Sequence, residues 1–186
     1  MVSRFNTAFS KFLFCIRITA NVNTLVKLLY NTKRLRWYKG GSVIPANAEE
    51  FTVYDCKINR QHCSIFLRTF NGDIDIFYEI FWKKIYSLPL QQELHYKVIV
   101  DIGANVGMAA LYFATHYPLA QIICIEPDKD NCTVLQKNCA PYKNIKIMQA
   151  AIMPQDGFVS IKKALLQYNN SVQFSDSEKN NVQAIC

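Results

Sequence analysis

The stretch that decides the fold reads Val98-Ile-Val-Asp-Ile-Gly-Ala-Asn-Val-Gly-Met-Ala-Ala-Leu-Tyr-Phe-Ala114, and Ile122-Ile-Cys-Ile-Glu-Pro127 follows it. A β-branched apolar run ends in an acid, turns at spaced glycines and enters an alanine-rich helix. A second apolar run then ends in Glu126. This order predicts a strand, a turn, a helix and a second parallel strand. It suits a nucleotide-like ligand, because backbone can approach the ligand at the turn while the carboxylate on the next strand accepts hydrogen bonds from ribose hydroxyls.

The turn contains the residue types that such an approach requires. Gly103 lacks a Cβ and permits a positive φ. Asn105 is the commonest non-glycine alternative at left-handed positions, and it can cap the helix beginning near Val106. Gly107 lets that helix lie close to its strand, and Asp101 can hold the turn or face an amino group of the ligand. The alternative is an ordinary strand–turn–helix crossing without a ligand, since glycine turns are common.

The spacing of the glycines argues against a dinucleotide such as NAD or FAD. The dinucleotide fingerprint requires glycine at positions 103, 105 and 108, where this chain has Gly103, Asn105 and Met108. Two of the three positions therefore fail, and a different nucleotide-like ligand is indicated.

Several motifs follow one another in a fixed order: Asp-x-Gly-Ala-Asn-x-Gly at 101–107, Ile-Glu-Pro-Asp at 125–128, Leu135-x-x-Asn138, Asn144-Ile-Lys-Ile-Met-Gln-Ala-Ala151 and Gly157-x-Val-x-Ile161. With the upstream segment 65–81, they resemble the FkbM-type S-adenosylmethionine-dependent methyltransferases over roughly residues 64–161. The resemblance implies an α/β, Rossmann-like class I methyltransferase fold that binds S-adenosylmethionine across the ends of its first two strands. It also implies O-methylation of a hydroxyl on a sugar or natural-product-like small molecule.

The resemblance also implies a set of cofactor-binding residues. The turn that holds the cofactor would consist of Asp101, Gly103, Ala104, Asn105 and Gly107. Glu126 would take the ribose hydroxyls, with Pro127 beside the adenine. Ala150 and Ala151 occupy the place where backbone atoms line the adenine pocket in that family.

No catalytic residue is indicated by the sequence. A general base could deprotonate the acceptor hydroxyl, and the candidates are Asp73, Asp75, Glu79, His95 and His116. None of them has a spacing that singles it out, so the catalytic residue stays unknown. The three histidines are scattered along the chain, and no metal site is expected.

The chain departs from the family beyond the third strand of the Rossmann half. The family continues with a strand that carries an Ile-Asp-x-Glu-Gly-type motif, whereas this sequence runs through a polar stretch at 169–181 to Cys186. In a doubly wound sheet, that strand forms the second wall of the ligand site. We therefore expect a fold that is incomplete at its C-terminus. Strand 97–102 would lack one neighbour, unless a tail strand from 171–185 takes its place. The alternative function is a catalytically inactive truncated remnant that is membrane-peripheral through its basic N-terminus.

The distribution of charge is uneven. Of the net charge of +7, residues 1–48 contribute eight Lys or Arg and no acid. At about 100° per residue, one helical face gathers Phe5, Phe9, Phe12, Leu13, Ile16 and Ala20, and Arg4 and Lys11 lie opposite. Such a helix can lie on an anionic membrane surface through residues 4–39, or it can pack on the Rossmann domain with a solvated basic face. No nucleic-acid-binding motif is present, so a nucleic-acid partner is not expected.

Composition is that of a globular protein, at 51% hydrophobic residues and a mean hydropathy of +0.01. The longest apolar runs are shorter than the roughly 18–20 residues that a membrane span needs. Seven cysteines form an odd number without Cys-x-x-Cys spacing, and no signal-peptide pattern is present. Both observations favour a reducing cytoplasm. Cys124, Cys132 and Cys139 are expected to pack in the core.

The coarse pattern predicts helices at 5–19, 21–31, 74–84 (capped by Asp73), 106–116 and 128–139. It predicts strands at 51–58, 63–68, 97–102, 121–125 and 144–148, followed by strand-like pieces at 157–165, 171–174 and 181–185. The alternation predicts three segments: a basic amphipathic helical extension at 1–48, a small α+β lead-in at 49–96 and the Rossmann-like domain at 97–186.

Overall fold

The computed structural model describes residues 2–38, 50–87, 96–162, 170–175 and 182–186. The chain divides into two compact units, Met1–Tyr86 and Ser87–Cys186, which are called unit 1 and unit 2 below. The finer division at residues 48 and 96 stays a prediction. Within the described ranges, no helix is both long and apolar enough to cross a membrane.

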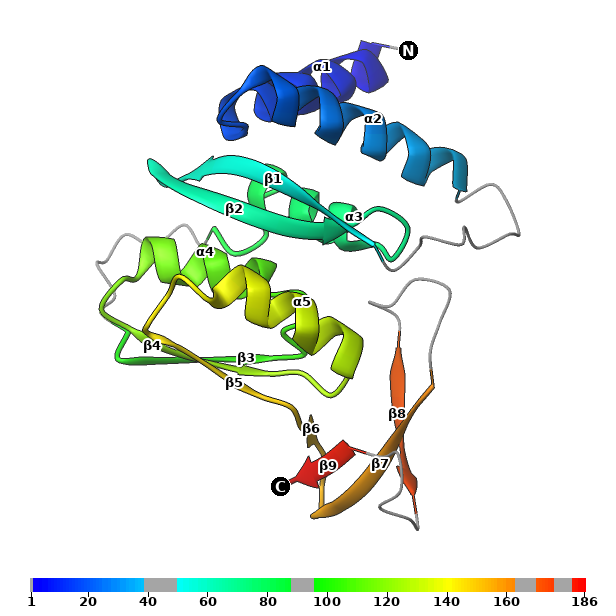
Figure 1. The fold of residues 1–186 in the computed structure, drawn as a ribbon, viewed down its shortest axis with the longest axis vertical. Coiled ribbons are helices and arrows are strands. Elements are labelled where there is room, and N and C mark those ends of the chain that lie inside the picture. The colour runs from blue at the N-terminus through cyan, green and yellow to red at the C-terminus, as the bar shows by residue number, and fades with distance from the viewer. Residues whose placement is uncertain (1, 39–49, 88–95, 163–169, 176–181) are drawn as a thin grey trace. The chain divides into compact units, whose positions relative to one another are not determined.

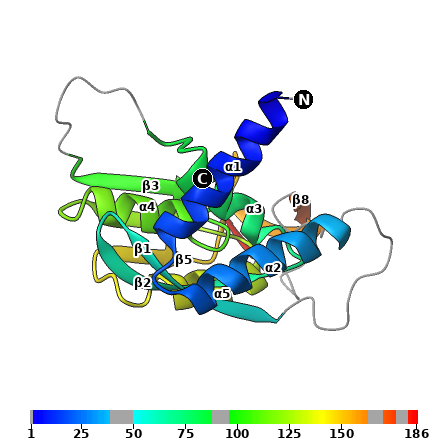
Figure 2. The same ribbon diagram turned by 90° about the horizontal axis from the view of Figure 1, so that it is seen from above.

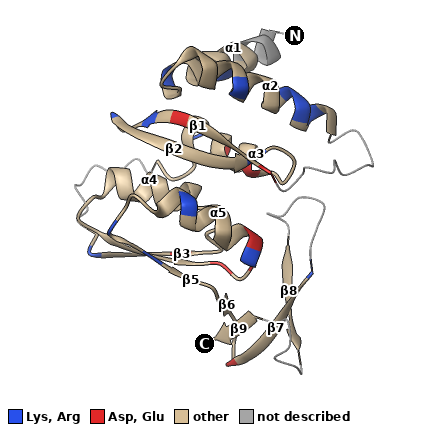
Figure 3. Cartoon of the chain, in the orientation of Figure 1, with Lys and Arg blue, Asp and Glu red and all other residues tan. Residues whose placement is uncertain are grey.

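Unit 1 contains two long helices that lie on one side of a β-hairpin (Figures 1 and 2), followed by a short helical segment. The elements are α1 (Val2–Ile18), α2 (Val22–Tyr38), β1 (Phe51–Ile58), β2 (Gln61–Arg68), α3 (Asp73–Phe77) and the π-helical turn η1 (Tyr78–Trp82). Both residues at the tip of the hairpin, Asn59 and Arg60, have positive φ, which suits the twist of antiparallel strands. Lys and Arg mark both long helices (Figure 3), whose described side chains include no acid.

Two predictions for unit 1 are wrong. The second helix does not end at residue 31 but runs to Tyr38, because the buried Leu35 continues the packed side of Leu28 and Asn31. Asp73 is not a helix N-cap, since the N-cap is Gly72 with a φ of 92°. The Asp73 carboxylate turns instead to the end of β2.

Unit 2 begins with a parallel sheet of order β3-β4-β5, formed by β3 (Val98–Ile102), β4 (Gln121–Ile125) and β5 (Ile145–Met148). The connecting helices α4 (Met108–His116) and α5 (Lys129–Cys139) lie together on one face of this sheet (Figure 1). The core between these helices and the sheet is a cluster of buried side chains: Ala104, Ala110, Ala114, Ile122, Cys124, Leu135 and Cys139. The predicted strands and helices of this half are confirmed to within two residues, and so is the burial of its three cysteines.

The opposite face of this sheet is uncovered along β3. Val98, Val100 and Ile102 are all more than half exposed, whereas Ile99 packs against the helix-covered core. The near-continuous apolar pattern of this strand is typical of burial on both faces, but the described side chains of β3 are buried on one face only. Parallel sheets normally have both faces covered, so this apolar surface is unusual.

The rest of unit 2 forms a second sheet of order β6-β9-β7-β8. Its strands are β6 (Ala151–Ile152), β7 (Gly157–Lys162), β8 (Ser171–Ser175) and β9 (Val182–Ile185), around a small core of Ala151, Val159 and Ala184. These strands pair with one another and not with β3. The tail therefore does not supply the missing neighbour of β3 in the part of the chain that the structure describes.

Candidate functional site

The candidate site lies where the three parallel strands end. The backbone N–H groups of Gly103 and Ala104 donate to the carbonyl oxygen of Ile125, at 2.9 and 3.1 Å. The N–H of Glu126 donates to the carbonyl oxygen of Met148 at 3.1 Å. These bonds fasten the turn after β3 to the ends of β4 and β5. The carboxyl edge of a parallel sheet is where such folds bind ligands.

The turn has the left-handed backbone that its sequence predicts. The φ angles are 75° at Gly103, 50° at Asn105 and 86° at Gly107. The side-chain oxygen of Asn105 accepts a hydrogen bond of 2.7 Å from the N–H of Val106. The helix, however, begins at Met108 with Gly107 as its N-cap, so Asn105 stabilises the turn rather than the first helical residue.

The two glycines of the turn do different things. A Cβ at Gly107 would lie 2.7 Å from Cδ1 of Leu135 and 3.2 Å from Sγ of Cys139. The close approach that Gly107 permits is therefore to α5, and the predicted approach to its own strand is wrong. A Cβ at Gly103 would meet no atom within 4 Å, so the space beside this residue is open.

Glu126 is the polar centre of the site, with only 5% of its surface exposed. Its Oε2 accepts a hydrogen bond of 2.8 Å from the N–H of Asn105. Its Oε1 accepts from the N–H of Asp128 at 3.0 Å and from the side-chain amide of Asn131 at 3.2 Å. Burial raises the pKa of this carboxyl, and the hydrogen bonds oppose the rise. A carboxylate offers about four acceptor positions, so these contacts leave room for one further donor.

Asp101 contributes a second buried carboxylate, and its exposed fraction is 8%. Its Oδ2 has no hydrogen-bond partner among the residues that the structure describes. Burial raises the pKa of Asp101 to about 6, and the negative charge of nearby Glu126 adds to the rise. Buried polar atoms without a partner are rare in folded proteins and call for an explanation. A ligand that donates a hydrogen bond and carries positive charge would satisfy this atom.

The remaining predicted site residues lie at the same edge of the sheet. Pro127 is partly buried and directly follows Glu126 after the end of β4. Ala150 is buried and lies after the end of β5, and Ala151 begins β6. Their contacts with an adenine ring stay a prediction.

Two polar side chains near the site, Asp128 and Asn138, have structural roles that the sequence analysis did not predict. The Asp128 carboxylate caps α5 by accepting from the N–H groups of Asp130 and Asn131, at 2.8 and 3.1 Å. An aspartate directly before a helical pattern is the signal that would have found this cap. The buried Asn138 donates through its amide to the carbonyl oxygen of Val106 at 2.7 Å. No local pattern reveals that bond, because 32 residues separate its partners.

Two of the candidate bases are held in ion pairs. Nε and Nη2 of Arg68 donate to the Asp73 carboxylate at 2.9 Å each, and both side chains are buried. Glu79 accepts from Nζ of Lys83 at 3.1 Å on the surface of unit 1. The buried ion pair of Asp73 and the surface ion pair of Glu79 account for the presence of these two acids without a catalytic role.

His116 does not join the site either. His116 lies in the last turn of α4, whose chain direction carries it to the amino edge of the sheet. Its ring stacks on Tyr112 at 4.0 Å, and its Nδ1 lies 2.8 Å from the Tyr112 carbonyl oxygen, to which it can donate. His95 lies outside the described residues. In the described part of the chain, no group of His, Cys, Asp or Glu side chains is arranged to hold a metal ion.

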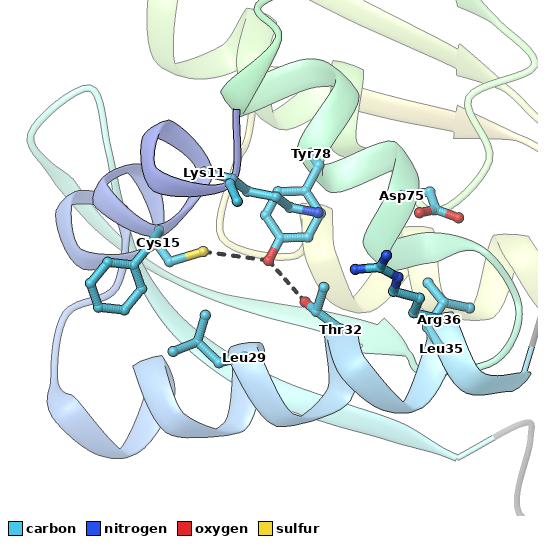
Figure 4. A pocket seen from close by; sticks show the side chains of 10 residues that line it. Lys11, Cys15, Leu29, Thr32, Leu35, Arg36, Asp75 and Tyr78 are labelled. Carbon is cyan, nitrogen blue, oxygen red and sulfur yellow. Dashed lines mark hydrogen bonds between the residues drawn. The ribbon is translucent and has the colours of Figure 1, made fainter. Parts of the chain in front are cut away.

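The last candidate base, Asp75, lines a separate cavity of about 320 Å³ inside unit 1 (Figure 4). There the Tyr78 hydroxyl lies 2.9 Å from the Thr32 hydroxyl and 3.4 Å from Sγ of Cys15. Nζ of Lys11 lies 3.4 Å from the centroid of the Tyr78 ring. Burial raises the pKa of both Tyr78 and Cys15. The phenol and the thiol therefore stay neutral at physiological pH, which argues against a nucleophile in this cavity.

Comparison with known proteins relates part of the chain to a methyltransferase. The chain is 35% identical over 60 residues to the 2-O-methyltransferase NoeI of Sinorhizobium fredii (strain NBRC 101917 / NGR234). The matched part is 32% of this chain and spans 25% of that relative. No family model matches the chain. The mixed α/β protein described above is thus related to a methyltransferase.

Proposed function

We propose that this chain is an S-adenosylmethionine-dependent methyltransferase of the Rossmann-like class I fold and the FkbM type. The observation that carries the proposal is the left-handed turn after β3, which the Glu126 carboxylate holds through the N–H of Asn105. The relationship to a 2-O-methyltransferase supports the same reading. The acceptor that we propose is a hydroxyl oxygen of a sugar or similar small molecule.

The residues of the turn fit this cofactor. Gly103 leaves open space beside the backbone, as a closely approaching ligand requires. Glu126 retains an acceptor position for a ribose hydroxyl. The unpartnered Oδ2 of Asp101 can accept from the ammonium group of the cofactor. Two neighbouring carboxylates also favour a ligand with positive charge over the pyrophosphate of a dinucleotide.

When bound, the cofactor supplies a methyl group on a positively charged sulfur. Transfer forms a bond from the acceptor oxygen to the methyl carbon, breaks the carbon–sulfur bond and releases the hydroxyl proton to a base or to water. The role of this chain is to hold the ribose through Glu126 and the ammonium group through Asp101, so that the reacting atoms are aligned. Such positioning accounts for much of the rate enhancement in reactions between two bound molecules.

A methyl-transfer assay tests the proposal. The chain is incubated with S-adenosylmethionine labelled in its methyl group and with a panel of sugars and hydroxylated small molecules. We expect label in a product that survives mild base, because a methyl ether is stable there and a methyl ester is hydrolysed. Label only in base-labile products would indicate methyl esters and would contradict methylation of a hydroxyl.

The alternative is a catalytically inactive remnant that keeps the fold of its relatives. The outer edge of β3 favours this reading, because no described strand pairs with it and a wall of the usual ligand site would lie beside that edge. Binding of the cofactor without transfer to any acceptor supports the alternative. For both readings we propose a cytoplasmic location, because all seven cysteines are free.

A further inference from the structure

Helix α1 packs with the side that the sequence pattern had marked as polar. Its buried residues are Cys15 and Ile18, and Lys11 lies over the ring of Tyr78 on the same side. Of the predicted apolar face, Phe9, Phe12 and Ile16 are exposed, whereas Leu13 and Ala20 are half-buried. Within unit 1, the helix therefore packs mainly through the side opposite its apolar face, and its predicted packing on the Rossmann domain stays a prediction.

Helix α2 is apolar on two opposite sides. One side is buried and consists of Thr24, Leu28, Asn31 and Leu35. The other side consists of Val22, Val26, Tyr30 and Trp37, all more than half exposed. At 100° per residue the two sets lie about half a turn apart, so the second set faces away from the hairpin on which the helix packs. An exposed apolar stripe of this length marks an interaction site.

The partner of this surface should carry negative charge. Arg17, Lys27, Lys33, Arg34 and Arg36 lie on the two helices, and the described helical residues include no acid. Two of these cations contact aromatic rings of the stripe, although Arg34 is half-buried and also lies 4.8 Å from the Phe70 ring centroid. Nζ of Lys33 is 4.7 Å from the Trp37 ring centroid, and the guanidinium of Arg34 is 5.6 Å from the Tyr30 ring centroid. Aromatic and aliphatic side chains flanked by cations are typical of helices that lie in the interface of an anionic bilayer.

We propose that the exposed stripe of α2, together with the exposed face of α1, docks this protein on an anionic lipid bilayer. The stripe, defined as Val22, Val26, Tyr30 and Trp37, enters the boundary between headgroups and acyl chains. The cations beside it meet the lipid phosphates and carboxylates. The bilayer is favoured over an acidic protein because apolar and cationic side chains alternate along one exposed side of a helix, as in helices that lie at an anionic interface. This inference does not depend on the proposed methyl transfer.

Flotation with lipid vesicles tests the docking. The full chain is mixed at low salt with vesicles of pure phosphatidylcholine or of equal parts phosphatidylcholine and phosphatidylserine. We expect flotation with the anionic vesicles only, lost at high salt, with a blue shift of tryptophan emission that Trp37→Phe reduces. Equal flotation with both kinds of vesicle, or with neither, would overturn the proposal.

A matched pair of variants distinguishes binding through the stripe from non-specific adsorption to vesicles. Val26→Glu adds a charge within the stripe, and Leu119→Glu adds the same charge at a 94% exposed residue of unit 2. We expect at least a tenfold loss of vesicle binding for Val26→Glu and no change for Leu119→Glu, with both variants folded by circular dichroism. Equal effects of the two changes contradict the proposal. The proposal is also contradicted if the wild-type chain does not bind vesicles but self-associates or binds polyglutamate, and Val26→Glu abolishes that association.

Discussion

Glu126 accepts a hydrogen bond of 2.8 Å from the backbone N–H of Asn105, which lies 21 residues earlier in the chain. The bond joins the end of β4 to the turn after β3 and stabilises the positive φ of 50° at Asn105. The carboxylate that we assign to the ribose is thus also part of the backbone structure of the turn. Loss of this side chain should change both the ligand affinity and the conformation of the turn.

Alanine at the two glycines of the turn should have different effects. Gly103→Ala introduces a strained φ in open space, so we expect a loss in the free energy of unfolding of about 1 kcal/mol. Gly107→Ala adds a clash with Leu135 to the same strain, and the loss should be clearly larger. Urea unfolding of both variants measures the difference. Gly103→Ala should nevertheless weaken cofactor binding, because it fills the space beside the turn. Equal stability losses, or a larger loss at Gly103, would show that Gly107 does not pack closely on Leu135 of α5.

The buried ion pair between Arg68 and Asp73 should dominate the stability of unit 1. Asp73→Ala leaves a buried guanidinium without its counter-charge, which typically costs about 3–5 kcal/mol. The matched control is Glu79→Ala, which removes an exposed pair with Lys83 and should cost less than about 0.5 kcal/mol. Denaturant unfolding checks both values. A small loss for Asp73→Ala would mean that Arg68 finds water or another partner.

Asp101 should make folding less favourable as the pH rises. Its pKa is raised from 3.8 to about 6 by burial, so between these values the folded chain holds a proton that the unfolded chain has released. The free energy of unfolding therefore falls as the pH rises from about 4 to about 6, by on the order of 3 kcal/mol, and stays lower above that range. Asp101→Asn should remove this dependence. Parallel pH profiles for the two proteins in urea unfolding would contradict the assignment.

The uncovered face of β3 should make the isolated chain associate with itself. Val98, Val100 and Ile102 present an exposed apolar row beside an edge that no described strand pairs with. Sedimentation velocity should show oligomers that grow with concentration, and Val100→Lys should reduce them. Leu119→Lys, at an exposed residue outside the row, serves as the control and should leave them unchanged. A monomer at every concentration, with efficient methyl transfer, would show that the exposed face of β3 does not cause self-association.

The parallel half of the fold could be predicted because its signals are local. The runs at 98–102 and 121–125 are short, β-branched and bounded by turn residues, and the left-handed residues of the turn are glycine and asparagine. The structure adds contacts between distant residues, such as the bond from Asn105 to Glu126 and the amide of Asn138 on Val106. The orientation of α1 could not be predicted, because an amphipathic pattern defines two faces without saying which one is covered. The π-helical turn at Tyr78–Trp82 leaves no mark in the pattern that predicted one continuous helix there.

Calorimetric titration with S-adenosylmethionine tests the central claim most directly. We predict binding to the wild-type chain and a loss of about 1–3 kcal/mol in binding free energy for Glu126→Ala, because a charge-assisted hydrogen bond to the ribose is removed. Circular dichroism of the variant serves as the check that it remains folded. NAD serves as the comparison ligand and should not bind. Binding of NAD without S-adenosylmethionine, or equal affinity of the folded Glu126→Ala variant, would contradict the account.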